Sequence, residues 1–241
     1  MGELTLIRHG QANSGATTEE DYDRLSALGH TQATLLGDWM RAHTDPFDLV
    51  LSGTMRRHRE TAAGMGYAPE IFDERLNEME YFALARDMQV HHDIAPPNSP
   101  EDFATHMPQT LAAWEQATIN GSEPFAVFES RINTALSEAA KPGKRVLCVT
   151  SGGVISMVMR AALGLSTHQM AHILLPIYNS SVHRFAIRPE GTFLMAFNAI
   201  PHLDPPAPVA SPHLTLPTHY PLSLPLVPVA VPQHMPLSPL H

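Results

Sequence analysis

The sequence has little cysteine and no long hydrophobic run, and each shortage excludes a class of protein. The single cysteine, Cys148, cannot form a disulfide within the chain, which argues against a disulfide-stabilised secreted domain. No stretch of 18 apolar residues occurs, so a transmembrane helix and a membrane partner are not expected. The N-terminus has no basic segment ahead of an apolar one, so the expected compartment is the cytoplasm.

Positive charge is scarce as well. The formal net charge is −9 at pH 7, and Lys141 and Lys144 are the only lysines. A protein that binds nucleic acid needs a basic stripe to neutralise phosphates, and the sequence shows none, so a nucleic-acid partner is not expected. Almost all of the positive charge is arginine, whose planar guanidinium binds phosphate in a bidentate manner.

The composition changes sharply at Pro201, which divides the chain into two parts. Residues 201–241 hold twelve of the 22 prolines and a single acidic residue, Asp204. Proline lacks a backbone N–H and interrupts both helix and sheet, so this Pro-rich tail is expected to be extended and disordered. Residues 1–200 are expected to form one folded domain, because their length allows a sizeable core.

Short apolar segments alternate with amphipathic ones over residues 3–200. The apolar segments are typical of strands buried on both faces, and the amphipathic segments repeat apolar residues at the spacing of a helix. The expected strands are 3–8, 48–52, 145–150, 181–188 and 193–198, and the expected helices are 29–43, 55–66, 125–140 and 153–163. This order predicts an α/β fold, a three-layer α/β/α domain with a largely parallel sheet.

Residues 79–122 interrupt that alternation. They contain several prolines and no strand pattern, and four apolar residues recur at helical spacing: Phe103, Met107, Leu111 and Trp114. We therefore predict that this segment is a helical cap, inserted above the edge of the sheet where the parallel strands end.

Two of the predicted strands end in polar residues followed by glycine. Residues 4–10 read LTLIRHG, and residues 147–155 read LCVTSGGVI. Ligands of open α/β sheets bind beyond the carboxyl ends of the strands, so Arg8, His9 and Ser151 are expected to lie at one site. A neutral imidazole can act as a nucleophile, and the neighbouring guanidinium can hold an anion.

Two further segments supply groups for the same site. Residues 52–62 read SGTMRRHRETA and place Arg57 in the first turns of a helix, where backbone donors favour anions. Residues 75–79 read RLNEM and lie just before the predicted cap. Glu78 in this loop is suited to protonate a leaving oxygen, and Glu80 competes with it for that role.

The segments LIRHG, SGTMRRHRETA, LNE and VTSGGVI occur in an order and spacing that resembles the histidine phosphatase superfamily, which has the phosphoglycerate-mutase-like fold. The resemblance covers residues 3–200. Within the superfamily, the chain resembles the bacterial phosphatases. The resemblance implies that His9 becomes phosphohistidine and that Arg8 and Arg57 hold the phosphoryl oxygens. It also implies that Glu78 is the general acid and base, that the substrate is a small-molecule phosphoester, and that the reaction uses neither cofactor nor metal.

The chain departs from the family pattern at Ser151. The superfamily usually has a second histidine before the Gly-Gly pair, whereas this sequence resembles a branch with Thr-Ser-Gly-Gly. A serine hydroxyl still donates a hydrogen bond but carries no charge, and loss of a transition-state donor costs about 10²–10³ in rate. The expected function is therefore a phosphomonoester hydrolase that is weakened or specialised. Two alternatives stay open: an inactive phosphate- or phosphoester-binding protein, and a phosphoglycerate-mutase-type phosphotransferase.

The sequence contains other histidines that could replace the missing second histidine or bind a metal. His58 and His183 are both expected at the surface or half-buried, which argues against a catalytic role. His91, His92 and Asp93 look like a metal cluster in sequence, but adjacent side chains on an irregular segment point in different directions. No metal site is therefore expected.

Overall fold

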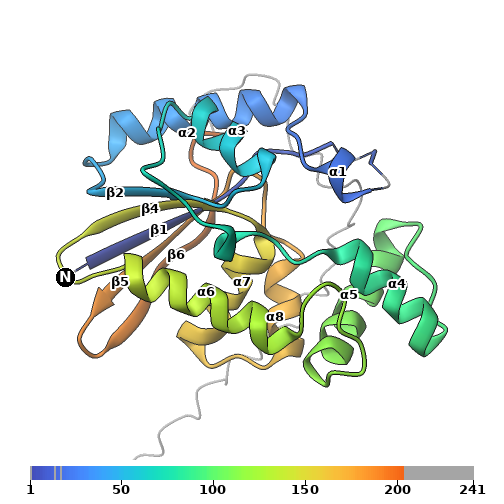
Figure 1. Cartoon of the computed structure of the whole chain (residues 1–241). Coiled ribbons are helices and arrows are strands. Elements are labelled where there is room, and N and C mark those ends of the chain that lie inside the picture. The colour runs from blue at the N-terminus through green and yellow to red at the C-terminus, as the bar shows by residue number, and fades with distance from the viewer. Residues whose placement is uncertain (1, 14, 17, 204–241) are drawn as a thin grey trace, which may run out of the picture.

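A six-stranded mixed sheet forms the centre of the computed structural model, which describes residues 2–13, 15–16 and 18–203 (Figure 1). The strands are β1 (Gly2–Arg8), β2 (Leu49–Ser52), β3 (Ile71–Phe72), β4 (Arg145–Thr150), β5 (Val182–Arg188) and β6 (Gly191–Ala199). Their order in the sheet is β3-β2-β4-β1-β5-β6. The pairs β1–β4, β2–β4 and β2–β3 are parallel, and β5 is antiparallel to both of its neighbours.

Helices cover both faces of this sheet, which confirms the predicted three-layer α/β/α fold (Figure 1). On one face lie α2 (Ala27–His43) and α3 (Arg56–Gly64), and on the other lie α6 (Phe125–Ala139) and α7 (Gly152–Leu163). The remaining helices are α1 (Glu19–Tyr22), α4 (Tyr81–His92), α5 (Pro100–Glu115), α8 (Thr167–Leu174) and a short 3₁₀ helix (Glu74–Leu76).

The central strands are buried on both faces, as their continuous apolar sequences predict. Leu6 and Cys148 point into the core beneath α6 and α7, whereas Ile7 and Val149 point into the core beneath α2 and α3. All four side chains are fully buried. Burial raises the pKa of the Cys148 thiol to about 12, so this cysteine is an unreactive core residue.

Every strand and helix predicted from the sequence is present, with ends that differ by no more than two residues. Three further elements, α1, β3 and α8, are not among those predicted, and the first two are too short to carry a periodic pattern. For α8 a signal exists, because Ser166 and Gln169 form a capping box at its start.

Helices α4 and α5 lie within residues 79–122, the segment predicted to be helical. That the segment is a separate cap inserted above the sheet stays a prediction. The predicted disordered tail begins at Pro201, and all but residues 201–203 of it lie outside the described residues.

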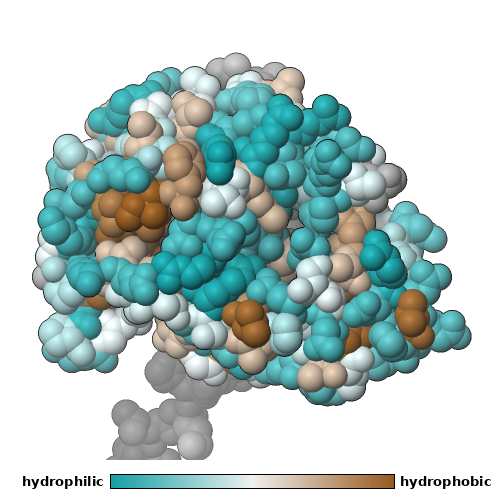
Figure 2. Space-filling view, viewed as in Figure 1, coloured by the Kyte–Doolittle hydropathy of each residue, from teal (hydrophilic) through white to brown (hydrophobic). Residues whose placement is uncertain are grey.

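The surface is mostly hydrophilic in the view of Figure 2, with brown hydrophobic areas separated by polar ones. The large hydrophobic side chains that are exposed come from different elements, for example Leu35 on α2, Val90 on α4 and Met195 on β6. Within the described ranges, no helix is long and apolar enough to cross a membrane.

Close packing of α2 against the end of α3 depends on Gly37. A Cβ atom at this position would overlap the backbone carbonyl of Met65, which cannot rotate away as a side chain can. We expect Gly37→Ala to lower the free energy of unfolding by about 1–3 kcal/mol, because overpacking outweighs the better helix propensity of alanine. Urea unfolding measures this change. Gly15→Ala is the matched control, because an added Cβ there meets no atom within 4 Å, and an equal loss in both variants would contradict the prediction.

Candidate active site

The carboxyl ends of β1 and β4 lie side by side, and they bring His9 and Ser151 together. The register pairs Arg8 with Thr150, so the next residue of each strand leaves the sheet at the same level. The backbone N–H of His9 donates to the carbonyl of Thr150 at 2.9 Å. His9 is only 2% exposed and Ser151 is fully buried, so both side chains lie inside the protein rather than on the surface.

His9 is held in one tautomer by its neighbour. Its Nδ1 lies 2.7 Å from the carbonyl oxygen of Gly10. A carbonyl can only accept, so Nδ1 carries the hydrogen and Nε2 keeps its lone pair. Burial, and then the charges of Arg57 and Arg8, hold the pKa of His9 well below its usual value. The imidazole is therefore neutral at pH 7 and has a free lone pair, as a nucleophile requires.

Two arginines lie near enough to His9 for their charges to lower its pKa. Arg57 is the second residue of α3 and is 1% exposed. Its guanidinium lies 5.1 Å from the centre of the Tyr22 ring. The guanidinium of Arg8 donates to the carbonyl of Ile177. Among the described residues, the Nε–H groups of both arginines are buried without a hydrogen-bond partner. Buried donors without partners are rare in proteins, so this pair indicates a place for an anion.

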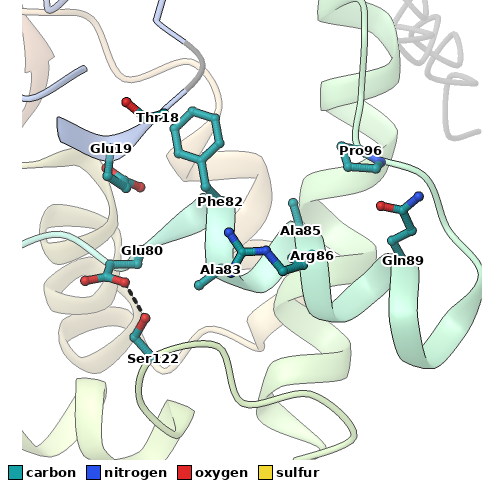
Figure 3. Close-up of a pocket in the computed structure, with 10 residues that line it drawn as sticks. All are labelled: Thr18, Glu19, Glu80, Phe82, Ala83, Ala85, Arg86, Gln89, Pro96 and Ser122. Carbon is teal, nitrogen blue, oxygen red and sulfur yellow. Dashed lines mark hydrogen bonds between the residues drawn. The ribbon is translucent and has the colours of Figure 1, made fainter. Parts of the chain in front are cut away.

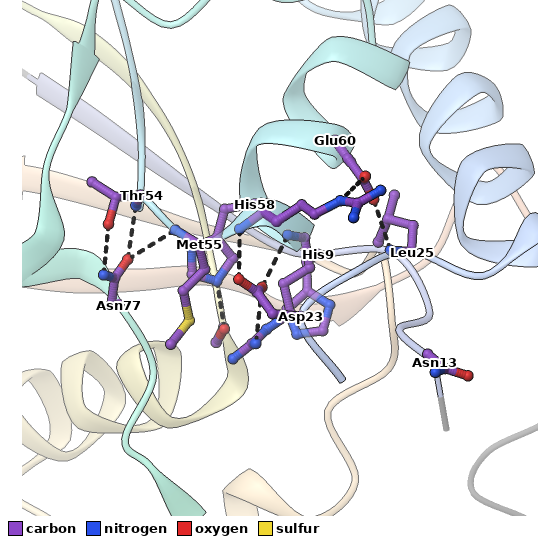
Figure 4. Close-up of polar contacts among 12 residues, drawn as sticks. His9, Asn13, Asp23, Leu25, Thr54, Met55, His58, Glu60 and Asn77 are labelled. Carbon is purple, nitrogen blue, oxygen red and sulfur yellow. Dashed lines mark hydrogen bonds and ion pairs between the residues drawn. The ribbon is translucent and has the colours of Figure 1, made fainter. Parts of the chain in front are cut away.

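Asp23 also reaches the site, although no motif in the sequence points to it. Its carboxylate accepts the backbone N–H groups of Arg56 and Arg57 at 2.9 and 3.1 Å, and it forms an ion pair with Nη1 of Arg57 at 3.1 Å. Asp23 thus caps α3, whose N-cap residue Met55 has no polar side chain. The dashed lines from Asp23 in Figure 4 mark these contacts. Only the tertiary structure reveals this contact, because 33 residues separate Asp23 from Arg56.

Glu78 lies over the first turn of α7. Its Oε2 accepts the backbone N–H of Gly153 at 2.9 Å, and its Oε1 accepts that of Met79 at 3.1 Å. The first turn of α7 therefore holds the carboxylate beside Ser151, at the start of the helix that the sequence predicts to face an anion.

The loop that carries Glu78 is fixed by Asn77. The side-chain oxygen of Asn77 accepts the backbone N–H of Thr54 at 2.7 Å, and its amide donates to the Thr54 hydroxyl at 2.7 Å (Figure 4). The guanidinium of Arg131 donates to the backbone carbonyl of Asn77 at 2.9 Å. Glu80, the alternative acid, instead accepts a hydrogen bond from Ser122 (Figure 3).

The expected exposure of His58 and His183 is wrong, because both are fully buried. Nε2 of His58 lies 2.6 Å from the hydroxyl of Ser151, and the ring centre lies 5.8 Å from that of His9. His183 instead pairs with Ser181 at 2.8 Å. The sequence could have indicated that His58 is buried, because it lies three and four residues before Thr61 and Ala62, on the same buried face of α3.

Buried neutral histidines make the stability of the fold depend on pH. Burial lowers the pKa of His9 and His58 well below 6.5 and that of His183 to about 3. Below pH 6.5 the unfolded chain binds protons that the folded chain does not, so acidification favours unfolding. We expect each of these histidines to reduce the free energy of unfolding by up to about 1.4 kcal/mol per pH unit below 6.5.

Urea unfolding at pH 7.5, 6.5 and 5.5 measures this dependence. His183→Phe is expected to unfold with a shallower pH dependence than the wild type, because one buried proton acceptor is removed. Equal stability of the wild type at pH 7.5 and 5.5 would contradict the prediction.

The residues considered as metal ligands in sequence do not assemble into a site. In the described part of the chain, no group of three or more histidine, cysteine, aspartate or glutamate side chains could hold a metal ion. His91 and His92 end α4, and His92 contacts the hydroxyl of Thr118 at 3.0 Å.

A cavity of about 460 Å³ lies between α1 and α4, and Thr18, Glu19, Glu80, Phe82 and Arg86 are among its lining residues. The Arg86 side chain extends beneath the Phe82 ring, on the side where Glu19 and Glu80 lie (Figure 3). A smaller cavity of about 180 Å³ shares Glu19 and Glu80 with it and is also lined by Arg57. The two cavities therefore share two of their lining residues, and the smaller one reaches Arg57.

The chain is thus an α/β protein with a neutral histidine and two arginines at the carboxyl edge of its sheet, an arrangement that can hold an anion. The chain belongs to the histidine phosphatase superfamily (branch 1), whose family model matches residues 4–200. The resemblance to this superfamily that the sequence shows is therefore confirmed.

Solved structures with the same fold include several phosphatases. Phosphoserine phosphatase from Entamoeba histolytica, in complex with 3-phosphoglyceric acid, is 19% identical with a TM-score of 0.61, covering 84% of this chain and 100% of that one. Alpha-ribazole phosphatase from Shigella flexneri is 21% identical with a TM-score of 0.59, covering 82% and 96%. A mycobacterial glucosyl-3-phosphoglycerate phosphatase in complex with VO3 is 21% identical with a TM-score of 0.58, covering 83% and 100%. At these identities the similarity shows a common fold.

Proposed function

We propose that this chain is a phosphomonoester hydrolase that acts through a phosphohistidine on His9. The observation that supports this function best is the state of His9, which is neutral, fixed by Gly10 and under the influence of two guanidinium groups whose Nε–H donors are buried and unpaired among the described residues. Phosphoryl transfer needs an in-line nucleophile, positive charge around the phosphoryl oxygens and a proton donor for the leaving group.

In the proposed reaction, the phosphoryl group binds between the guanidinium groups of Arg8 and Arg57. The Nε2 lone pair of His9 attacks phosphorus, the bond to the ester oxygen breaks, and Glu78 gives that oxygen a proton. Glu78 then removes a proton from water, which attacks the phosphohistidine and releases inorganic phosphate. Each proton that leaves Glu78 in the first half is thus returned in the second.

The cavity beside the site favours a small leaving group of mixed polarity. Glu19 and Glu80 repel further negative charge, whereas Arg86 can pair with one acidic group and Phe82 can contact an apolar part. We therefore propose phosphomonoesters of limited negative charge as substrates, rather than polyphosphates. Phosphatases of the same fold are named for phosphoserine and glucosyl-3-phosphoglycerate, which are compounds of this kind.

Trapping the covalent intermediate tests this function. After alkaline quenching of the enzyme during turnover of a ³²P-labelled phosphomonoester, we expect protein-bound label that is stable in base and lost in acid, as a phosphoramidate is. Peptide mapping should place the label on the peptide that contains His9. His106→Leu, which removes a buried histidine of α5 outside the site, should be labelled like the wild type. Label on another residue would refute the assignment of His9.

A further inference from the structure

We propose that His58 and Ser151 act as one unit, in which His58 directs the serine hydroxyl toward the phosphoryl oxygens of a substrate bound at His9. Ser151 then touches the substrate, and His58 is a positioning residue that acts through Ser151. This inference rests on the proposed function, since it assigns two further roles within the same site.

The contact between the two side chains is short and completely buried. Nε2 of His58 lies 2.6 Å from Oγ of Ser151, and both residues have no exposed surface. Ser151 is the N-cap residue of α7, a position where a serine hydroxyl usually accepts a backbone N–H of the first turn. Here it forms no such capping bond, and His58 is its one hydrogen-bond partner among the described residues. The hydroxyl is thus committed to the imidazole rather than to the helix.

The other ring nitrogen decides which partner donates the hydrogen. Nδ1 of His58 is buried without a hydrogen-bond partner in the described ranges, and it packs so closely against Gly53 that a Cβ there would overlap it. Burial, and then Arg57, keep the pKa of His58 well below 6.5, so the ring is neutral and carries a single N–H. A buried N–H without a partner is rarer and less favourable than a buried acceptor without one. The hydrogen therefore lies on Nε2 and is donated to Ser151.

This direction leaves the hydrogen of the serine hydroxyl free. Because Oγ accepts from His58, its own O–H must point to another acceptor. The imidazole of His9 lies beside His58, with 5.8 Å between the ring centres, and Ser151 leaves β4 at the level where His9 leaves β1. A phosphoryl group on His9 is the acceptor that this geometry favours. A neutral donor that is already oriented stabilises the charge that develops on phosphoryl oxygens in the transition state.

The pairing with His58 also changes the effect that the serine of the Thr-Ser-Gly-Gly segment is expected to have on activity. A serine alone is a short donor that rotates freely, which predicts a weakened enzyme. A serine held by a buried imidazole is a fixed donor, so the site is built around the hydroxyl. Ser151→His is then expected to lower kcat, because the added ring would occupy the volume that His58 fills. Combining it with His58→Ala, which frees that volume, is expected to recover part of the loss.

A double-mutant cycle on kcat for an aryl phosphate tests the unit. We expect Ser151→Ala to lower kcat about 10²–10³-fold and His58→Leu about 10–100-fold, with KM changed less than about threefold. The double variant should be no slower than Ser151→Ala, because His58 acts only through that hydroxyl. His58→Gln, which keeps an N–H donor of similar reach, should regain part of the rate lost in His58→Leu. His106→Leu is the control, because His106 is also buried and contacts the Thr110 hydroxyl at 2.9 Å, outside the site.

Several outcomes would overturn the proposal. Wild-type kcat in Ser151→Ala would show that the hydroxyl does not assist the reaction. Equal kcat in His58→Leu and His106→Leu would show that His58 only fills space. If His58→Leu does not fold, the Ser151→Ala measurement decides. The tautomer is tested without turnover by ¹⁵N chemical shifts of the His58 ring, where a hydrogen on Nδ1 would refute the proposal. An inactive wild type would refute the proposed function, whereas an active wild type with unaffected His58 and Ser151 variants would refute this inference alone.

Discussion

Replacing His9 with alanine is expected to reduce kcat/KM for a phosphomonoester by about 10⁴–10⁶-fold, because it removes the nucleophile of the covalent step and the neighbouring His58 cannot take its place. The imidazole has one lone pair, at Nε2, since Nδ1 is bound to the carbonyl of Gly10. His58 cannot replace it, because its Nε2 is engaged by Ser151 and its Nδ1 is enclosed by the protein. Initial rates with 4-nitrophenyl phosphate measure the effect.

The loss of rate must be separated from a loss of folding, since His9 is buried. His9→Ala should still bind vanadate or phosphate, because Arg8 and Arg57 remain in place, and binding is measured by the rise in melting temperature with added anion. Equal hydrolysis by the wild type and His9→Ala, together with intact anion binding, would refute the phosphatase and favour a phosphate-binding protein. Conversion of one phosphoglycerate isomer into the other by the wild type would favour a mutase.

Replacing Glu78 with glutamine is expected to slow the first turnover of an alkyl phosphate about 10²–10⁴-fold, because an alkoxide leaving group needs a proton. Glutamine keeps the shape of the side chain, and its oxygen can still accept the N–H of Gly153. The first turnover of 4-nitrophenyl phosphate should change by less than about tenfold, because nitrophenolate leaves without a proton. Rapid-quench measurement of the burst separates this step from hydrolysis of the phosphohistidine.

Glu80→Gln is the matched control for Glu78→Gln. Both carboxylates lie in the same loop, but Glu80 contacts Ser122 in the cavity rather than α7. It should leave the dependence on the leaving group unchanged, although KM can change because Glu80 lines the cavity. If Glu80→Gln shows the large alkyl-phosphate effect and Glu78→Gln does not, the acid is Glu80.

Most of the fold could be predicted because the buried strands are nearly continuous apolar runs and the long helices repeat their apolar residues regularly. β1 and β4 are buried on both faces, so each is recognised by composition alone. α1 and β3 could not be predicted, because a helix of four residues and a strand of two contain only about one period each, which is too short to show a repeating pattern. Tertiary contacts set their position. For example, β3 extends the sheet by pairing with β2.

The candidate site was only partly predictable. His9 and Ser151 follow the two central strands, and the rule that ligands bind at the carboxyl edge of such a sheet places them together. Asp23 was not identified and His58 was expected at the surface or half-buried, because their roles depend on contacts between residues far apart in sequence, 34 residues to Arg57 and 93 residues to Ser151. The helical spacing of His58 indicates that it is buried, but no local pattern names the partner of either residue. The catalytic roles of all these groups stay predictions until the variants are measured.

The position of β1 in the middle of the sheet also has a consequence for the order of folding. β1 pairs with β4 and β5. Its residue Glu3 lies beside Arg145 of β4 and beside Ala186 of β5. During translation, the segment Gly2–Arg8 must therefore wait for more than half of the chain to be synthesised before either neighbour exists. Closing so long a loop is slow, because the entropic cost precedes the gain from pairing. The nucleophilic histidine at the end of β1 can therefore become functional only late in the folding of the nascent chain.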